Sequence, residues 1–61
     1  MELTRLEKRI LKALKEEGRA TAPMLAEKVG TTPASARTVL TRFVKMGLVK
    51  RVSRGLYEAA E

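Results

Sequence analysis

Three glycines, at positions 18, 30 and 47, constrain the fold of this chain most, because each follows a stretch with helical periodicity. Glycine is common just beyond a helix C-terminus, since it adopts the left-handed backbone conformation required there at no steric cost. The glycines therefore predict three successive helices, followed by a segment of different character. The predicted helices cover residues 3–17, 22–29 and 33–46.

The first predicted helix is amphipathic. Apolar residues recur at helical spacing on one face, which we expect to be buried. Basic residues occupy the opposite face, where they either form a solvated surface, the preferred interpretation, or contact phosphate groups at the periphery of a bound nucleic acid. The apolar face consists of Leu3, Leu6, Ile10 and Leu14, and the basic face of Arg5, Lys8, Arg9, Lys12 and Lys15.

The second and third predicted helices have clear start signals. Thr21 and Thr32 are placed to cap them, and each is followed by a proline in the first turn, where a missing N–H costs nothing. The second helix is only about two turns long, so it must pack on other elements to be stable. We expect Met24 and Met46 to fill gaps in the core. The expected core positions of the third helix are Ala36, Val39, Leu40, Phe43 and Met46.

After Gly47 the pattern changes from helical to β-prone. Two short apolar runs flank the turn-like sequence Ser53-Arg54-Gly55, which predicts a hairpin over residues 48–59. Residues 19–21 are interpreted as a short connection. The predicted fold is thus a single domain over residues 1–61, mainly α with a small β-hairpin. Because isolated hairpins are marginally stable, we expect some of its apolar side chains to pack on the helices. The candidates are Leu48, Val52, Leu56 and Tyr57.

The chain contains neither cysteine nor histidine. It therefore lacks the residues for a disulfide or a zinc–thiolate site, and it lacks the commonest general base. It has no glycine-rich phosphate loop and no carboxylates paired for acid–base chemistry. We predict that the protein is not an enzyme, with no catalytic residues, no metal and no cofactor.

The sequence also predicts where the protein is found. No apolar run approaches the roughly 20 residues needed to cross a bilayer. The first residues are charged and lack the apolar stretch of a signal peptide. We therefore expect a cytoplasmic protein with no membrane partner.

Charge is distributed unevenly along the chain. Thirteen Lys and Arg against seven Asp and Glu give a formal net charge of +6, and no acidic residue occurs between Glu27 and Glu58. A basic segment of this kind is typical of a protein that binds a polyanion. The alternative is a solvated surface with a chance imbalance of charge. The basic residues of the segment are Lys28, Arg37, Arg42, Lys45, Lys50, Arg51 and Arg54.

Residues 21–46 have the layout of a helix-turn-helix, in which a short helix, a turn of about three residues and a longer helix follow one another. The second helix of such a pair lies in the major groove of DNA, with its N-terminal residues near base edges. Small side chains early in the helix allow close approach, and polar and basic ones contact bases and phosphates. The predicted DNA-binding residues here are Thr32, Ala34, Ser35, Arg37, Thr38, Thr41, Arg42 and Lys45.

Several short motifs then follow one another in a fixed order: Leu25-Ala26, Gly30-Thr31-Thr32-Pro33-Ala34-Ser35, Phe43, Gly47-Leu48-Val49 with Arg51, and Gly55-Leu56-Tyr57. Over nearly the whole chain they resemble the winged helix-turn-helix domains of prokaryotic transcription regulators, including the MarR-like repressors. The resemblance implies a regulator that binds double-stranded DNA.

The resemblance also implies roles for the hairpin. Arg54 at its tip would reach the adjacent minor groove or phosphate, with Lys50 and Arg51 on its flank. The family members considered carry additional helices for dimerisation or ligand sensing, which this sequence lacks. No small-molecule ligand is therefore predicted.

Two other interpretations of the basic surface remain open. Winged helices also serve as protein-docking modules, and an acidic partner would bind the same face. An apolar surface patch would favour this alternative, and Val44 and Val49 are the candidates for it. The other alternative is a sequence-neutral binder of DNA or RNA. Because the core of so short a chain is marginal, we also expect a homodimer formed through the first helix.

Overall fold

Threonine side chains begin the three helices of the computed structural model, which describes residues 3–60. Thr4, Thr21 and Thr32 each accept a hydrogen bond from the backbone N–H three residues further on. The glycines predicted to end the helices do so, each with a positive φ. The elements are α1 (Arg5–Glu17), β1 (Arg19–Thr21), α2 (Ala22–Val29), α3 (Pro33–Met46), β2 (Val49–Ser53) and β3 (Leu56–Ala59).

The second and third helices have the predicted bounds, whereas the first begins at Arg5 and not at Leu3. The Thr4 hydroxyl accepts from the Glu7 N–H at 3.1 Å, and Glu7 Oε1 accepts from the Thr4 N–H at 2.8 Å. This reciprocal pair is a capping box, which satisfies two backbone donors that a helix N-terminus otherwise leaves unpaired. The helix therefore starts after Thr4, and Leu3 packs on the core from outside it.

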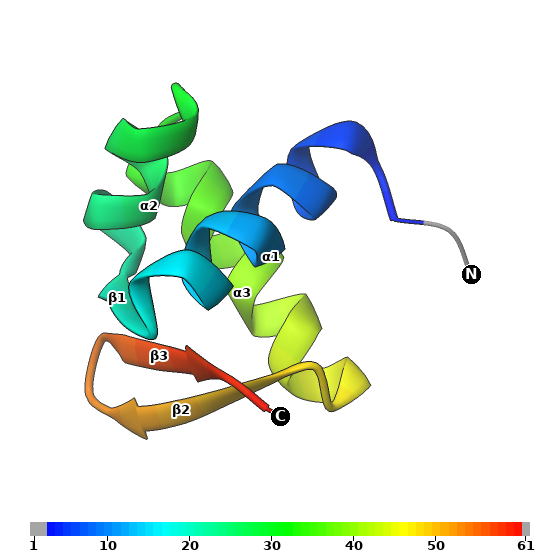
Figure 1. The fold of residues 1–61 in the computed structure, drawn as a ribbon, viewed down its shortest axis with the longest axis vertical. Coiled ribbons are helices and arrows are strands. Elements are labelled where there is room, and N and C mark those ends of the chain that lie inside the picture. Colours follow the sequence, from blue (N-terminus) through cyan, green and yellow to red (C-terminus); the bar gives the residue numbers. More distant parts are fainter. Residues whose placement is uncertain (1–2, 61) are drawn as a thin grey trace.

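The predicted hairpin is present, and the segment expected to be a connection joins it as a third strand. β1 pairs antiparallel with β3, with Ala20 opposite Tyr57, and the strand order is β1-β3-β2. The prediction for residues 19–21 was wrong because three residues are too few to show an alternating pattern. Their pairing partner lies far away in the sequence. Figure 1 shows the sheet along one end of the three helices.

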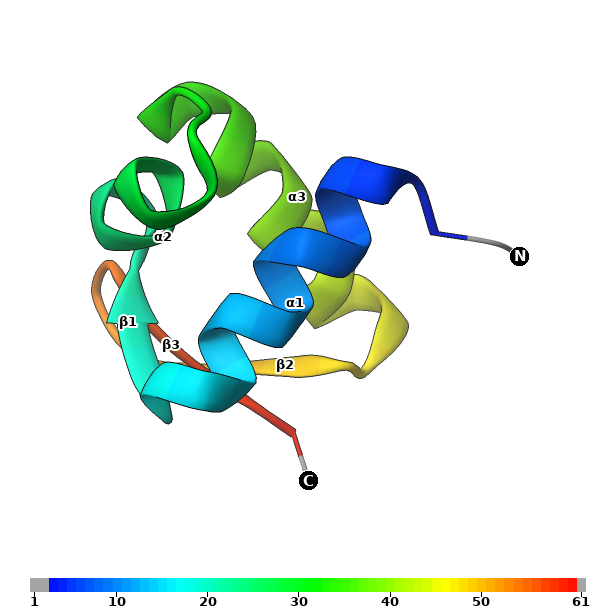
Figure 2. The ribbon, with the colours of Figure 1, turned by 45° about the horizontal axis from the view of Figure 1, so that its top comes forward.

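The core lies between the helices and the sheet. Its largest fully buried side chains come from all three helices, and Ala20, Val49 and Tyr57 complete it from the strands. Figure 2 shows α1 in front of α3 with α2 beside them, so that each helix turns one face inward. These largest side chains are Ile10, Leu14, Leu25, Leu40 and Phe43.

Two methionines predicted to fill the core are exposed instead, Met24 by 49% and Met46 by 41%. Met24 lies about 100° around α2 from Leu25, outside the narrow apolar stripe that a helix of two turns buries. Met46 continues the apolar spacing of α3, but it is the last helical residue, where the chain turns at Gly47 toward the sheet.

The hairpin packs on the helices through only some of its apolar residues. Tyr57 is buried, Leu48 and Leu56 are half-buried, and Val52 is exposed. Of the two candidates for an apolar surface patch, Val44 is exposed, whereas Val49 is 3% exposed and belongs to the core. No helix among the described residues has both the length and the apolar character needed to span a bilayer.

Candidate nucleic-acid interface

The outer face of α3 is polar and carries no acidic residue. Its buried stripe faces the core, so helical periodicity turns the intervening positions toward solvent. The structure places most of the residues that the sequence predicts to bind DNA on this exposed face, and only Ser35 is half-buried. The exposed ones are Thr32, Ala34, Arg37, Thr38, Thr41, Arg42 and Lys45.

A groove runs between this face of α3 and the hairpin. Arg37 and Thr41 line it from α3, and Arg51 and Arg54 line it from the hairpin. The fold thus gathers three arginines from distant parts of the sequence around one groove. Its remaining walls are Ala22, Pro23, Pro33, Ala34, Gly55 and Tyr57.

The two basic residues on the flank of the hairpin lie on different faces of the sheet. Lys50 is opposite Glu58 and Arg51 is opposite Tyr57 in the β2–β3 register. Residues directly opposite each other share a face, and successive residues of a strand alternate between faces. Arg51 therefore shares the groove with Tyr57, whereas Lys50 lies on the other face with Glu58. The sequence prediction had grouped Lys50 with Arg51.

Polar side chains at the start of α3 are partly engaged within the helix. The Thr32 hydroxyl accepts from the Ser35 N–H at 3.2 Å and donates to Ser35 Oγ at 3.1 Å. The first turn of α3 contains no acidic residue, so no negatively charged side chain of that turn compensates the positive end of its dipole. This end of the helix is thus electrostatically suited to a phosphate group.

The threonines of the exposed face donate back to their own helix. The Thr38 hydroxyl donates to the Ala34 carbonyl at 3.0 Å, and the Thr41 hydroxyl to the Arg37 carbonyl at 2.9 Å. Their protons are therefore used, which leaves each oxygen as an acceptor and each methyl group for apolar contact. In DNA, such a side chain matches a base amino group or a thymine methyl.

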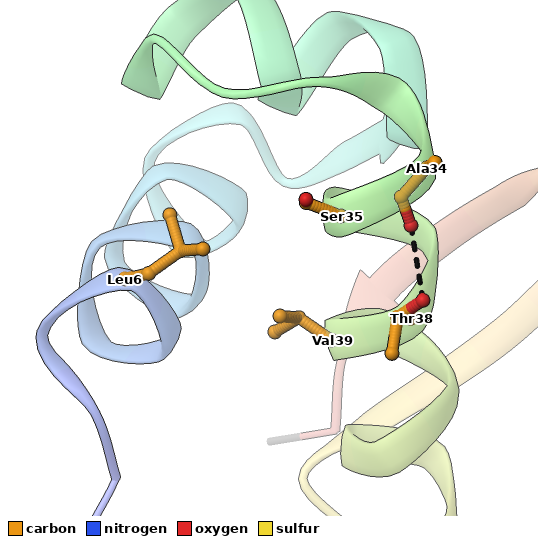
Figure 3. Close-up of a pocket in the computed structure, with 5 residues that line it drawn as sticks. All are labelled: Leu6, Ala34, Ser35, Thr38 and Val39. Atoms are coloured by element: carbon orange, nitrogen blue, oxygen red, sulfur yellow. Dashed lines mark hydrogen bonds between the residues drawn. The ribbon is translucent and has the colours of Figure 1, made fainter.

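A shallow depression borders the N-terminal half of α3. Figure 3 shows Leu6 of α1 pointing across it toward Ser35 and Val39, with Thr38 bonded to Ala34 beside them. The lining is apolar except for two hydroxyl groups, and it contains no charged group. Residues 3–60 hold no cluster of three or more Asp, Glu, Cys or His side chains that could bind a metal ion.

Arg42, predicted to hold a phosphate, is paired within the protein. Its Nη1 donates to Glu7 Oε2 at 2.6 Å, while the Arg42 side chain keeps 47% of its surface exposed. Glu7 is 3% exposed and is the one buried charged residue among residues 3–60. The same carboxylate accepts from the Thr4 N–H, so Glu7 links the N-terminus of α1 to Arg42 in the C-terminal half of α3. The Thr4-x-x-Glu7 spacing of a capping box is present in the sequence and was missed when the helix was predicted to begin at Leu3. No local signal indicates the partner of Glu7 on α3.

Loss of the Glu7 charge is expected to destabilise the fold. Glu7→Gln keeps the capping geometry but replaces a charge-assisted hydrogen bond by a neutral one, at a cost of about 1 kcal/mol because Arg42 is half exposed. Glu7→Ala also removes the side-chain acceptor of the Thr4 N–H, although Thr4 still caps the helix, and should cost about 2 kcal/mol. Urea denaturation followed by circular dichroism measures both. The exposed Glu27→Gln is the control, and equal stability of all the variants would contradict a structural role for the pair.

Most of the other acidic side chains within residues 3–60 pair with cations away from the groove. Arg19 Nε lies 3.3 Å from Glu58 Oε1, and Lys28 Nζ lies 2.8 Å from Glu17 Oε2. The hydrogen bond that Lys28 Nζ donates to Glu17 raises the pKa of the Lys28 amine. Lys28 also pairs with Glu16, so it belongs to an ion-pair network and not to a free basic surface. Within residues 3–60, five exposed cations of α3 and the hairpin make no ion pair. They are Arg37, Lys45, Lys50, Arg51 and Arg54.

Known proteins share this architecture. A profile of the winged helix-turn-helix DNA-binding family matches residues 3–50. The crystal structure of T. acidophilum IdeR is similar over 97% of this chain, with a TM-score of 0.79 and 19% sequence identity. This chain spans 29% of that protein, and a likeness at such identity shows the fold alone.

No curated protein sequence matches the chain. The match does not distinguish MarR-like repressors from other winged helix-turn-helix proteins, so that finer likeness stays a prediction. The profile nevertheless covers most of the chain, and the three helices and the hairpin have the arrangement it implies. The chain therefore belongs to the winged helix-turn-helix DNA-binding family.

Proposed function

We propose that this domain is a transcription regulator that places α3 in the major groove of double-stranded DNA and the β2–β3 hairpin against the adjacent minor groove or phosphates. The observation that carries the proposal is the groove in which Arg37, Arg51 and Arg54 meet. These side chains make no ion pair within residues 3–60. Family membership supports DNA as the polyanion that this groove receives.

We assign the residues to base-reading and phosphate-binding groups by their positions in the fold. Arg37 lies in the N-terminal half of α3, where its guanidinium can pair with a guanine through two hydrogen bonds. Thr38 and Thr41 offer an acceptor and a methyl group beside it. Lys45, in the last turn of α3, and Arg54, at the hairpin tip, are assigned to phosphates. The small side chain of Ala34 allows the helix to approach the bases closely.

The experiment that tests the proposal is selection from a pool of random duplex DNA at two salt concentrations, with sequencing of the bound fraction. A regulator should enrich a motif that persists at the higher salt, because base contacts do not depend on counterion release. Salt-sensitive binding without a motif would indicate a sequence-neutral binder. No binding even at low salt would contradict the proposal and favour a protein partner, for which the exposed Val44 offers an apolar contact.

Arg54→Ala should weaken binding to all duplexes alike. The logarithm of the association constant for DNA falls linearly with the logarithm of the salt concentration. If Arg54 neutralises one phosphate, its loss should make this slope less negative by about 0.9. Fluorescence anisotropy with the selected duplex and an unrelated one, each at several salt concentrations, measures this. Arg19→Ala removes the same charge from β1, outside the groove, and should leave the slope nearly unchanged. An unaltered slope for Arg54→Ala would argue against a contact by the hairpin.

The homodimer that we expect to form through the first helix stays a prediction, but the charge of α1 limits which surface of the helix could form the contact. The outermost face of α1 is basic, so a symmetric contact centred on it would place cations against cations. Pairing through α1 would therefore use the margins of its apolar face, where Leu6 and Leu11 are half-buried, together with Leu3 just before the helix.

A further inference from the structure

The solvent face of α1 forms a second cationic surface, which we call the α1 stripe: Arg5, Lys8, Arg9 and Lys12. All four side chains are exposed, and none makes an ion pair within residues 3–60. At about 100° per residue they fall within an arc of about 100° on the helix. Glu7, which lies between Arg5 and Lys8 in the sequence, is buried. Glu16, one turn after Lys12, lies 3.5 Å from Lys28 Nζ.

The α1 stripe is unfavourable for the helix that carries it. Arg5 and Arg9 are four residues apart, as are Lys8 and Lys12, and like charges at this spacing destabilise a helix. Arg5 and Lys8 also lie near the N-terminus, where the helix dipole disfavours cations. The core gains nothing from these exposed side chains. An external polyanion would offset both unfavourable terms, so the arrangement points to a ligand.

The α1 stripe and the groove beside α3 face different sides of the molecule. Ile10 and Leu14 of α1 and Leu40 and Phe43 of α3 enter the same core, so the exposed faces of the two helices point away from each other. Figure 2 shows α1 in front and α3 behind it. A duplex bound to α3 therefore leaves the α1 stripe open to a second ligand.

We infer that the α1 stripe binds a second segment of double-stranded DNA, so that one domain bridges two duplexes. This inference rests on the proposed function, since the first duplex occupies α3 and the hairpin. Lys8 and Lys12 lie one turn apart, and the whole stripe extends about 10 Å along the helix. A duplex carries one charge per about 1.7 Å of its axis, so it offers several phosphates over that length.

Two other classes of polyanion fit the α1 stripe less well. Binding of a helix to a lipid surface requires an apolar face that enters the membrane, and the apolar face of α1 is turned into the core. Protein interfaces usually contain an apolar centre, and α1 exposes no large apolar side chain. A row of cations with no exposed large apolar side chain beside it matches the phosphate backbone best.

Energy transfer between two duplexes, one carrying a donor fluorophore and the other an acceptor, tests the inference. The wild-type protein should bring them together at low salt. The triple variant Lys8→Gln/Arg9→Gln/Lys12→Gln should lower this transfer at least tenfold, yet bind a single duplex within a few-fold of wild type. The matched triple Arg37→Gln/Arg51→Gln/Arg54→Gln removes equal charge from the groove and should lose single-duplex binding. Circular dichroism shows whether each variant is folded. If the Lys8/Arg9/Lys12 triple variant unfolds, the three corresponding single variants replace it, and each should lower the energy transfer.

Several outcomes would overturn the inference. One is wild-type protein that binds one duplex without any transfer, which would leave the proposed function intact. Another is undiminished transfer by the α1 triple variant. A third is a dimer that sedimentation detects without DNA and that the α1 triple variant abolishes. Such a dimer would carry two α3 faces, so it would join two duplexes without any DNA bound to the α1 stripe. In a competition experiment, poly-glutamate and unlabelled DNA are compared at equal concentrations of charge. If poly-glutamate displaces the second duplex at the lower concentration, the natural ligand of the α1 stripe would be an acidic protein. Wild-type protein that binds no duplex would contradict the proposed function itself.

Discussion

Removal of the Arg37 side chain is expected to weaken specific DNA binding by about 1–3 kcal/mol and to relax the sequence preference at one base pair. Arg37 lies on the exposed face of α3 and lines the groove with Arg51 and Arg54. It makes no ion pair within residues 3–60, so no internal partner has to be broken before it contacts a base. Arg37→Ala should therefore remove the proposed base contact and leave the fold intact.

The conservative variant Arg37→Lys separates base reading from general charge. Lysine keeps the positive charge but lacks the planar fork that makes two parallel hydrogen bonds to guanine. It should retain binding to unrelated duplexes and lose the preference that wild type shows. Anisotropy titrations with the selected duplex and its single-base variants measure both quantities. A specificity profile unchanged in Arg37→Ala would remove Arg37 from the base-reading residues.

Phe43→Ala is expected to destabilise the fold by about 3–5 kcal/mol, the usual cost of deleting a buried aromatic ring. Phe43 is the largest fully buried side chain and lies on α3, opposite the face proposed to bind DNA. A domain of this length has a total stability of roughly 3–9 kcal/mol at the usual contribution per residue. The variant should therefore be partly or wholly unfolded at ambient temperature, as circular dichroism and urea denaturation would show.

The neighbouring residue provides a matched control for Phe43. Val44 is on the same helix, but 39% of its surface is exposed. Val44→Ala should change stability by no more than about 0.5 kcal/mol, since exposed substitutions away from caps and networks are usually small. Similar losses for the two variants would contradict the core described for this domain.

Local interactions made the helices predictable from the sequence. Thr21 and Thr32 cap their helices through backbone groups three residues away, and Gly30 and Gly47 end them through their own backbone conformation. Such signals involve neighbours in the chain, so they are visible without knowledge of the fold. The exposed face of α3 was predictable for the same reason, because the buried positions recur with the helical period.

Interactions between distant residues were decided by the tertiary structure alone. Three such interactions join residues that are far apart in the chain, so no local sequence pattern predicts them. They are the pairing of β1 with β3, the hydrogen bond between Glu7 and Arg42, and the shared groove of Arg37 and Arg51. The placement of Lys50 on the face opposite Arg51 depended on the strand register. The sequence by itself thus determined the helices, the hairpin and the charge that they carry. Only the packing of the chain decided which of those charges face one groove, because that depends on contacts formed across the whole fold.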